Sequence, residues 1–218
     1  MTREEIIRCI YDKKLIAIVR GMEPEACVAA AQAVLAGGIC MIEVTFNQKA
    51  EDGFRATTEG IRAICEKLGD KMVVGAGTVL TCRQVDLAYE AGARYIVTPS
   101  FNAEVVRYAR EKGMVTLPGV LTPTEAVAAY EAGADFVKIF PVGNLGAAYI
   151  KAIRAPLSHI PMLAVGGVNE NNVADFLQAG AVGAGIGGNL VNAKWLASGE
   201  LDKITAKARE FAANAGVR

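Results

Sequence analysis

The sequence has very little histidine and no excess of charge of either sign. Its 218 residues include one His, and 23 Lys and Arg residues balance 23 Asp and Glu residues. A single imidazole excludes sites built from several histidines, among them the commonest zinc sites. The balanced charge argues against nucleic acid or an anionic membrane surface as the main partner, because both normally bind proteins with an excess of basic residues.

The sequence also lacks the cysteine pairs that are typical of disulfide frameworks and zinc knuckles. Its five cysteines are odd in number and widely spaced, and none forms a CxxC pair. This pattern predicts a reducing compartment, the cytoplasm. The charged N-terminal segment has no apolar run of the signal-peptide kind. The uncharged stretch Ala26–Ile42 contains Gly37 and Gly38, so it predicts a helix that ends in a turn, with no membrane association.

Eight short apolar runs alternate with Ala-rich segments of helical periodicity. Each run is nearly continuously apolar, as expected of parallel strands buried on both faces. No Pro/Ser-rich linker or change in composition divides the chain, so we predict one domain over residues 1–218. The predicted strands are Leu15–Val19, Ile39–Phe46, Met72–Gly75, Tyr95–Thr98, Met114–Leu117, Phe136–Phe140, Met162–Val165 and Ala181–Ile186.

Helical segments lie between these runs, and one more precedes the first. Eight β–α units in a chain of this length predict an α/β fold of the (β/α)8 TIM-barrel type with an extra N-terminal helix. A doubly wound open sheet fits less well, because it usually has fewer strands and a nucleotide fingerprint that this sequence lacks. The predicted helices are Arg3–Tyr11, Pro24–Leu35, Asp52–Leu68, Arg83–Glu90, Ala103–Lys112, Pro123–Glu131, Ala147–Ile153, Glu170–Gln178 and Leu201–Ala213.

Three charged residues lie inside or directly after these apolar runs. Lys138 and Glu43 each interrupt a run, and Arg20 closes the first one. A buried ammonium is costly unless it is paired or deprotonated, and a free amine is the nucleophile of Schiff-base chemistry. If Lys138 and Glu43 both point inward, they face each other at the mouth of the barrel. Either a catalytic pair or a structural salt bridge accounts for this placement, and the first is favoured because buried lysines are rare.

Glycine pairs follow the seventh and eighth runs. Gly166-Gly167 and Gly187-Gly188 expose backbone N–H groups at the loops where barrels commonly bind phosphate. Gly75 and Gly77, after the third run, lack the remainder of a dinucleotide fingerprint, so we expect them to let the backbone approach the substrate. His159 precedes the seventh run and is therefore expected at the opposite end of the barrel, away from the chemistry.

Six segments together resemble one family of enzymes. They are Ile42–Phe46, Val74–Leu80, Ile96–Pro99, Pro118–Val120, Val137–Pro141 and Val165–Val168, and they occur in the same order as in the 2-keto-3-deoxy-6-phosphogluconate and 4-hydroxy-2-oxoglutarate aldolases. This resemblance runs from Leu15 to about Leu190. It implies a class I, Schiff-base aldolase of the cytoplasm, with no metal or other cofactor. It also implies a homotrimer of barrels that cleaves a phosphorylated keto acid to pyruvate and an aldehyde such as glyceraldehyde 3-phosphate.

The resemblance also implies roles for single residues. Lys138 is similar to the Schiff-base lysine and Glu43 to the general acid/base. Substrate contacts are implied for Arg20, Asn47, Thr78, Pro99 and Phe140, and phosphate contacts for Gly166, Gly167, Gly187, Gly188 and Asn189.

Two positions depart from the pattern of the gluconate enzymes. Many of those enzymes have Arg at the position of Asn47, whereas the 6-phosphogalactonate branch has Asn there, as this chain does. Asn189 stands in place of a phosphate-loop serine. We expect a phosphogluconate-type substrate, with 4-hydroxy-2-oxoglutarate as a further one. The galactonate-specific enzyme and a phosphate-binding barrel epimerase are the alternatives.

Overall fold

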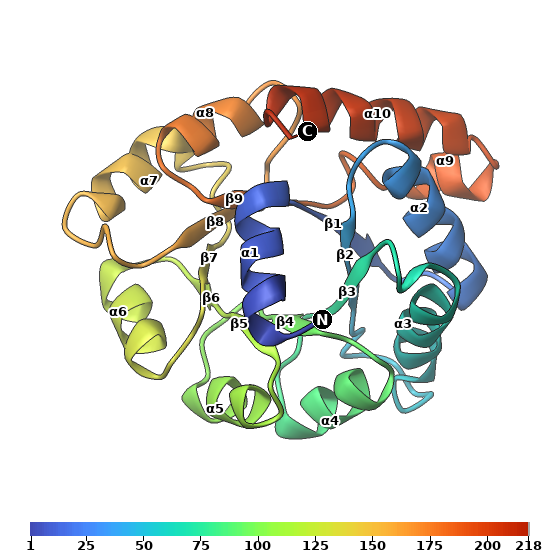
Figure 1. The fold of residues 1–218 in the computed structure, drawn as a ribbon, viewed down its shortest axis with the longest axis horizontal. Coiled ribbons are helices and arrows are strands. Elements are labelled where there is room, and N and C mark those ends of the chain that lie inside the picture. Colours follow the sequence, from blue (N-terminus) through green and yellow to red (C-terminus); the bar gives the residue numbers. More distant parts are fainter. Residues whose placement is uncertain (218) are drawn as a thin grey trace.

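The chain forms a ring of parallel strands surrounded by helices, as the ribbon in Figure 1 shows. The structure is a computed structural model and describes residues 1–217. The predicted (β/α)8 barrel is confirmed. The strands are β1 (Leu15–Arg20), β2 (Met41–Thr45), β3 (Val73–Gly77), β4 (Tyr95–Val97), β5 (Val115–Leu117), β6 (Gly119–Val120), β7 (Val137–Ile139), β8 (Met162–Val165) and β9 (Gly183–Ile186).

Strand β5 corresponds to the predicted strand Met114–Leu117, and the two-residue strand β6 continues it beyond the predicted end. Pro118 separates them, because proline has no N–H group to donate to a ladder. β5 pairs with β4, whereas β6 pairs with β7. The continuous segment Val115–Val120 therefore closes the ring, and the nine strands correspond to eight barrel positions.

The helices cover the outside of the ring, apart from the first. Pro at the first helical turn and Thr side chains that cap the backbone begin several of them. No helix in the described part of the chain is long and apolar enough to cross a bilayer. The helices are α1 (Arg3–Lys13), α2 (Pro24–Ala36), α3 (Arg55–Leu68), α4 (Cys82–Glu90), α5 (Ala103–Glu111), α6 (Pro123–Glu131), α7 (Gly146–Arg154), α8 (Val173–Gln178), α9 (Ala193–Ala197) and α10 (Leu201–Asn214).

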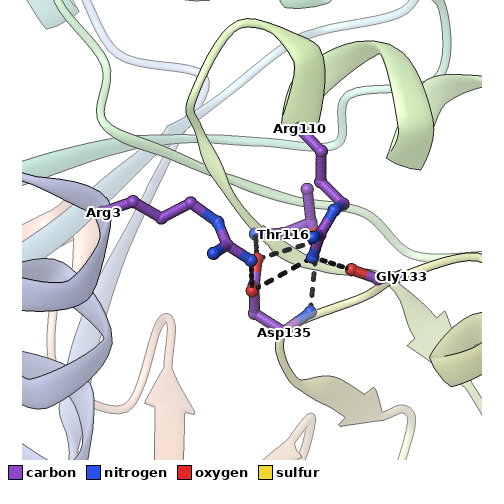
Figure 2. A network of polar contacts seen from close by, with 5 residues as sticks. All are labelled: Arg3, Arg110, Thr116, Gly133 and Asp135. Atoms are coloured by element: carbon purple, nitrogen blue, oxygen red, sulfur yellow. Dashed lines mark hydrogen bonds and ion pairs between the residues drawn. The ribbon is translucent and has the colours of Figure 1, made fainter.

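Helix α1 lies across the middle of the ring in Figure 1. Its Ile6 and Ile10 are buried in the cluster that fills the barrel interior, together with Tyr95. Figure 2 shows how its N-terminal end is attached: Arg3 forms an ion pair with Asp135, which precedes β7. The extra N-terminal helix thus closes the N-terminal end of the barrel and leaves the chemistry to the other end.

Alternating strand residues face the barrel interior and the helices. On β2, Ile42 and Val44 belong to the outer cluster between strands and helices, and Met41 belongs to the inner one. On β7, Val137 and Ile139 are in the outer cluster. Because successive side chains of a strand alternate in direction, the residues between them point into the barrel.

Candidate active site

Lys138 and Glu43 point into the barrel toward its C-terminal end. Each lies between two outward-facing residues of its strand, and both line one narrow, otherwise apolar space deep in the barrel. Lys138 is 6% exposed and Glu43 is 2% exposed. The sequence prediction that the two charges share the barrel interior is confirmed.

Burial moves the two ionisable groups toward their neutral forms. Loss of solvation lowers the pKa of the Lys138 ammonium, an effect that Glu43 opposes and the Arg20 guanidinium reinforces. Loss of solvation raises the pKa of the Glu43 carboxyl, and here both Lys138 and Arg20 act in the opposite direction. The site therefore favours a lysine that gives up its proton and a glutamate that takes one.

A direct ion pair does not account for this arrangement. The ion pairs within the described residues include neither Glu43 nor Lys138, so the less favoured alternative, a structural salt bridge between them, is not observed. Glu43 Oε2 is buried without a hydrogen-bond partner, as is the hydroxyl of Thr45 two residues along the strand. Buried polar atoms are normally hydrogen-bonded, so these two neighbouring unpartnered oxygen atoms indicate a site that is completed by a ligand.

A cavity of about 400 Å³ opens above Lys138 at the C-terminal end of the strands. It joins the narrow space around Glu43, because Ile18, Lys138, Val165 and Gly185 line both. Eight of the predicted site residues line this larger cavity: Arg20, Lys138, Phe140, Gly166, Gly167, Gly187, Gly188 and Asn189.

The Phe140 ring forms part of the cavity wall next to the amine. The Lys138 Nζ atom lies 4.6 Å from the centre of this ring, a distance at which a cation is attracted to an aromatic face. Gly166 has φ +86°, and a β-carbon there would come within 3.0 Å of the same ring. Glycine at 166 therefore does more than expose an N–H group, since it makes room for the aromatic side chain beside Lys138.

The two glycine loops meet on one side of the cavity. The Asn189 side-chain nitrogen donates to the Val168 carbonyl at 2.7 Å, which joins the loop after β9 to the loop after β8. No backbone hydrogen bond of the described residues uses the N–H groups of Gly167, Gly188 or Asn189. Nothing lies within 4 Å of the place where a Gly188 side chain would begin. Free amides around open space are a suitable site for an anion.

Three predicted substrate residues do not line the cavity that contains Lys138. Asn47 lines a neighbouring hollow of about 460 Å³ between the loops after β1 and β2. Pro99 is half-buried, and its carbonyl group packs against Gly119 of β6. Thr78 is half-buried at the end of β3, in the left-handed conformation with φ +57°. His159 is exposed before β8 and packs against Tyr130, so its expected place away from the site is confirmed.

Gly75 and Gly77 have a packing role that the sequence interpretation did not include. A β-carbon on Gly75 would lie 2.3 Å from the Tyr95 ring, whose hydroxyl donates to the Ile42 carbonyl at 2.7 Å. A β-carbon on Gly77 would lie 2.8 Å from Glu43 Oε1. Side chains from the neighbouring strands therefore take this space, and the Gly77 gap holds the carboxylate.

The sequence interpretation also missed the apolar part of the cavity wall. Ile18 and Val165 line it beside Lys138, and Met22 lines both this cavity and the hollow at Asn47. Strand alternation could have identified Ile18, because it shares its inward direction with Arg20 two residues along β1. No pattern in the sequence marks Met22, which lies in a loop.

Comparisons with known proteins agree with this geometry. The family model described as KDPG and KHG aldolase matches residues 6–207. The 2-dehydro-3-deoxy-6-phosphogalactonate aldolase of Escherichia coli K12 is 43% identical, over 82% of this chain and 85% of its own. The 2-dehydro-3-deoxy-phosphogluconate aldolase of Treponema pallidum is 34% identical, over 97% and 98%. A solved structure described as "Native KDPGal structure" superimposes with a TM-score of 0.82 at 40% identity, covering 92% and 93% of the two chains.

The chain is a carbon–carbon lyase. It forms a parallel barrel with a buried lysine and glutamate at the C-terminal end, and relatives named as aldolases match most of its length. More particularly, the chain belongs to the KDPG and KHG aldolase family.

Proposed function

We propose that this chain is a class I aldolase that cleaves a 2-keto-3-deoxy-6-phospho sugar acid to pyruvate and glyceraldehyde 3-phosphate. The observation that carries the proposal is the buried Lys138 amine, whose pKa is lowered by burial, in one space with the unpartnered Glu43 carboxylate. A desolvated amine is a nucleophile toward ketones, and a nearby carboxylate can transfer the protons that the reaction requires.

The reaction begins when the Lys138 nitrogen attacks C2 of the keto acid, and loss of water from the adduct leaves an iminium. Glu43 takes the proton of the C4 hydroxyl, directly or through a water, while the C3–C4 bond breaks. The electrons of that bond move into the iminium to form an enamine, and the aldehyde leaves. Glu43 returns the proton to C3, and water then releases pyruvate from the lysine.

The phosphate of the substrate is placed at the two glycine loops. The unused N–H groups of Gly167, Gly188 and Asn189 surround this part of the cavity. Arg20, on the wall of the same cavity, adds positive charge for an anionic substrate. Holding the distal end in this way uses binding energy remote from the reacting bond to position it. A homotrimer in the cytoplasm is proposed on the family resemblance.

Reductive trapping tests the Schiff base. Borohydride added with pyruvate is expected to leave a covalent adduct on the Lys138 peptide, detected as a mass shift, and Lys138→Met should abolish it. Lys151→Met is the control, because Lys151 lies on the outer helix α7 and should not affect trapping. An adduct on another lysine, or none in the unaltered protein, would refute the proposal.

Of the two C4 epimers, we propose the galactonate form as the better substrate. The relatives named for 6-phosphogalactonate are 43% and 42% identical to the chain, against 34% and 32% for relatives named for phosphogluconate. Pyruvate release from both phosphorylated epimers and from 4-hydroxy-2-oxoglutarate should show at least about a tenfold preference in kcat/KM for galactonate, equivalent to about 1.4 kcal/mol. A preference for gluconate would overturn this assignment of the epimer and leave the aldolase reaction intact.

A further inference from the structure

Helix α1 and the segment before β2 each bring a cysteine to the N-terminal end of the barrel. Cys9 lies on α1 between Ile6 and Ile10, which are buried in the cluster that fills the barrel interior. Cys40 directly precedes β2, and its carbonyl accepts the N–H of Val73 of β3 at 2.8 Å. Both cysteines are half-buried and pack against the same interior cluster. The helix and the sheet therefore hold the two side chains in fixed places.

The two thiols interact with each other. The Cys9 thiol donates a hydrogen bond to the Cys40 sulfur, which raises the pKa of Cys9 and lowers the pKa of Cys40. Lys13, at the end of α1, lowers the pKa of both thiols, and Asp12 raises the pKa of Cys9. Tyr95 of β4 also faces the pair, because the charge of either thiolate raises the pKa of its hydroxyl. Cys40 is thus the thiolate of the pair, and Cys9 holds the proton.

The other three cysteines have no thiol as a partner. Cys27 and Cys65 donate to backbone carbonyls at 3.7 and 3.6 Å. Burial raises the pKa of both thiols and also that of Cys82. Because oxidants react with the thiolate and not with the thiol, Cys40 is the most reactive of the five free cysteines.

We propose that Cys9 and Cys40 are a redox-active dithiol, which hydrogen peroxide oxidises to an intramolecular disulfide between α1 and the segment before β2. The Cys40 thiolate attacks one oxygen of the peroxide, the O–O bond breaks, hydroxide leaves, and Cys40 becomes a sulfenic acid. Cys9 gives its proton to the hydroxide and attacks the Cys40 sulfur. The S–S bond forms, the S–O bond breaks, and the oxygen leaves as a second water. The two sulfurs together lose the two electrons that reduce the peroxide.

This disulfide would fasten the helix that closes the barrel. The loop from Cys9 to Cys40 contains the whole of β1 and α2, so the crosslink restricts the unfolded chain and favours the folded one. In a reducing compartment, as the cysteine pattern predicts, the pair stays as thiols until an oxidant is present. The inference does not depend on the proposed aldolase reaction, because both cysteines lie at the end of the barrel opposite the Lys138 cavity.

Peptide mapping tests the disulfide. The reduced protein is treated with a small excess of hydrogen peroxide at neutral pH, and the remaining thiols are alkylated before digestion. We expect the Cys9 and Cys40 peptides to be joined by a disulfide that dithiothreitol reverses. The crosslinked protein should have a Tm about 5–10 °C higher than the reduced protein. Cys65→Ala is the matched control, because it removes another half-buried thiol and leaves the pair intact.

Three results would overturn the inference. They are a disulfide between two copies of the chain, preferential oxidation of another cysteine, and failure of Cys65→Ala to form the same crosslink. An unchanged or lower Tm in the crosslinked protein would overturn the stabilising role of the disulfide.

Two substitutions of Cys9 separate its hydrogen bond from the crosslink. Cys9→Ser keeps a donor for Cys40 but cannot form the disulfide, so peroxide should leave a sulfenic acid on Cys40 that dimedone captures. Cys9→Ala also removes the donor, so the pKa of Cys40 rises. Alkylation of Cys40 by iodoacetamide at neutral pH should then be about tenfold slower than in Cys9→Ser, as for a rise of about one unit in pKa. Equal alkylation rates, or no dimedone adduct in Cys9→Ser, would contradict the activation of Cys40 by Cys9.

Discussion

At the scale of single residues, the reactivity of Lys138 is a balance between burial and two neighbouring charges. Burial lowers the pKa of its ammonium, Arg20 lowers it further, and Glu43 raises it. The same Arg20 guanidinium lowers the pKa of the Glu43 carboxyl, against the effect of burial. One arginine therefore promotes both the free amine and the carboxylate, which are the two forms with which the proposed reaction begins.

This balance predicts that substitutions of Glu43 and Arg20 shift the pH dependence of trapping on Lys138 in opposite directions. Glu43→Gln removes a negative charge that stabilises the ammonium, so the pKa of Lys138 falls and the rise of trapping rate with pH moves to lower pH. Arg20→Met removes a positive charge that destabilises the ammonium, so the same rise moves to higher pH. The measurement is the rate of reductive trapping at saturating pyruvate against pH, with Arg62→Met on the outer helix α3 as the control. Shifts in the same direction for both variants would contradict the assigned electrostatics.

Glu43→Gln also tests the role of the carboxylate in bond cleavage. Glutamine fills the same space but cannot take the C4 hydroxyl proton. We expect the variant to form the imine with pyruvate and to turn over the sugar acid on the order of 10²–10⁴-fold more slowly, the usual contribution of a general acid/base. Turnover at the unaltered rate would show that another group transfers the proton.

At the scale of elements, two glycines of β3 make room for different side chains: Gly77 for the Glu43 carboxylate and Gly75 for the Tyr95 ring. Gly77→Ala would place a β-carbon 2.8 Å from Glu43 Oε1 and displace the carboxylate. We expect kcat to fall about 100-fold, the cost of a misplacement of about 1 Å. Gly75→Ala is the comparison on the same strand, because its β-carbon would meet the Tyr95 ring instead. It should lower the free energy of unfolding by about 1–3 kcal/mol through overpacking and retain kcat in the folded protein.

The same strand shows how far sequence patterns can predict a site. Alternation along β2 and β7 was sufficient to place Glu43 and Lys138 inside the barrel, because the direction of a side chain depends only on its parity in the strand. The role of Gly75 depends on Tyr95, which is adjacent only through the pairing of β3 with β4. Asn47 was expected at the substrate from its position in a motif, and its loop places it in a neighbouring hollow that shares Met22 with the Lys138 cavity. Contacts between elements and the paths of loops follow no periodic pattern along the chain, so sequence periodicity does not predict them.

At the scale of the whole molecule, the barrel separates stability from chemistry by placing them at opposite ends. Asp135, whose side chain is 4% exposed, lies at the N-terminal end and pairs with Arg3 of α1 and Arg110 of α5. Figure 2 shows its carboxylate between these arginines and Thr116, from whose N–H it accepts a hydrogen bond at 2.9 Å. The acidic side chain thus joins the helix that closes the barrel to three other segments.

This separation predicts that Asp135→Ala weakens the fold and leaves the reaction intact. The substitution removes the shared acceptor of two arginines and a buried N–H group, so urea unfolding should show a loss of about 2–4 kcal/mol. Lys203→Ala is the control, because it breaks an exposed ion pair with Glu200 and should cost less than about 1 kcal/mol. Below the melting temperature, kcat and KM of Asp135→Ala should equal those of the unaltered protein, since the Lys138 cavity opens at the other end of the strands. A change in KM with stability preserved would mean that α1 is coupled to the active site.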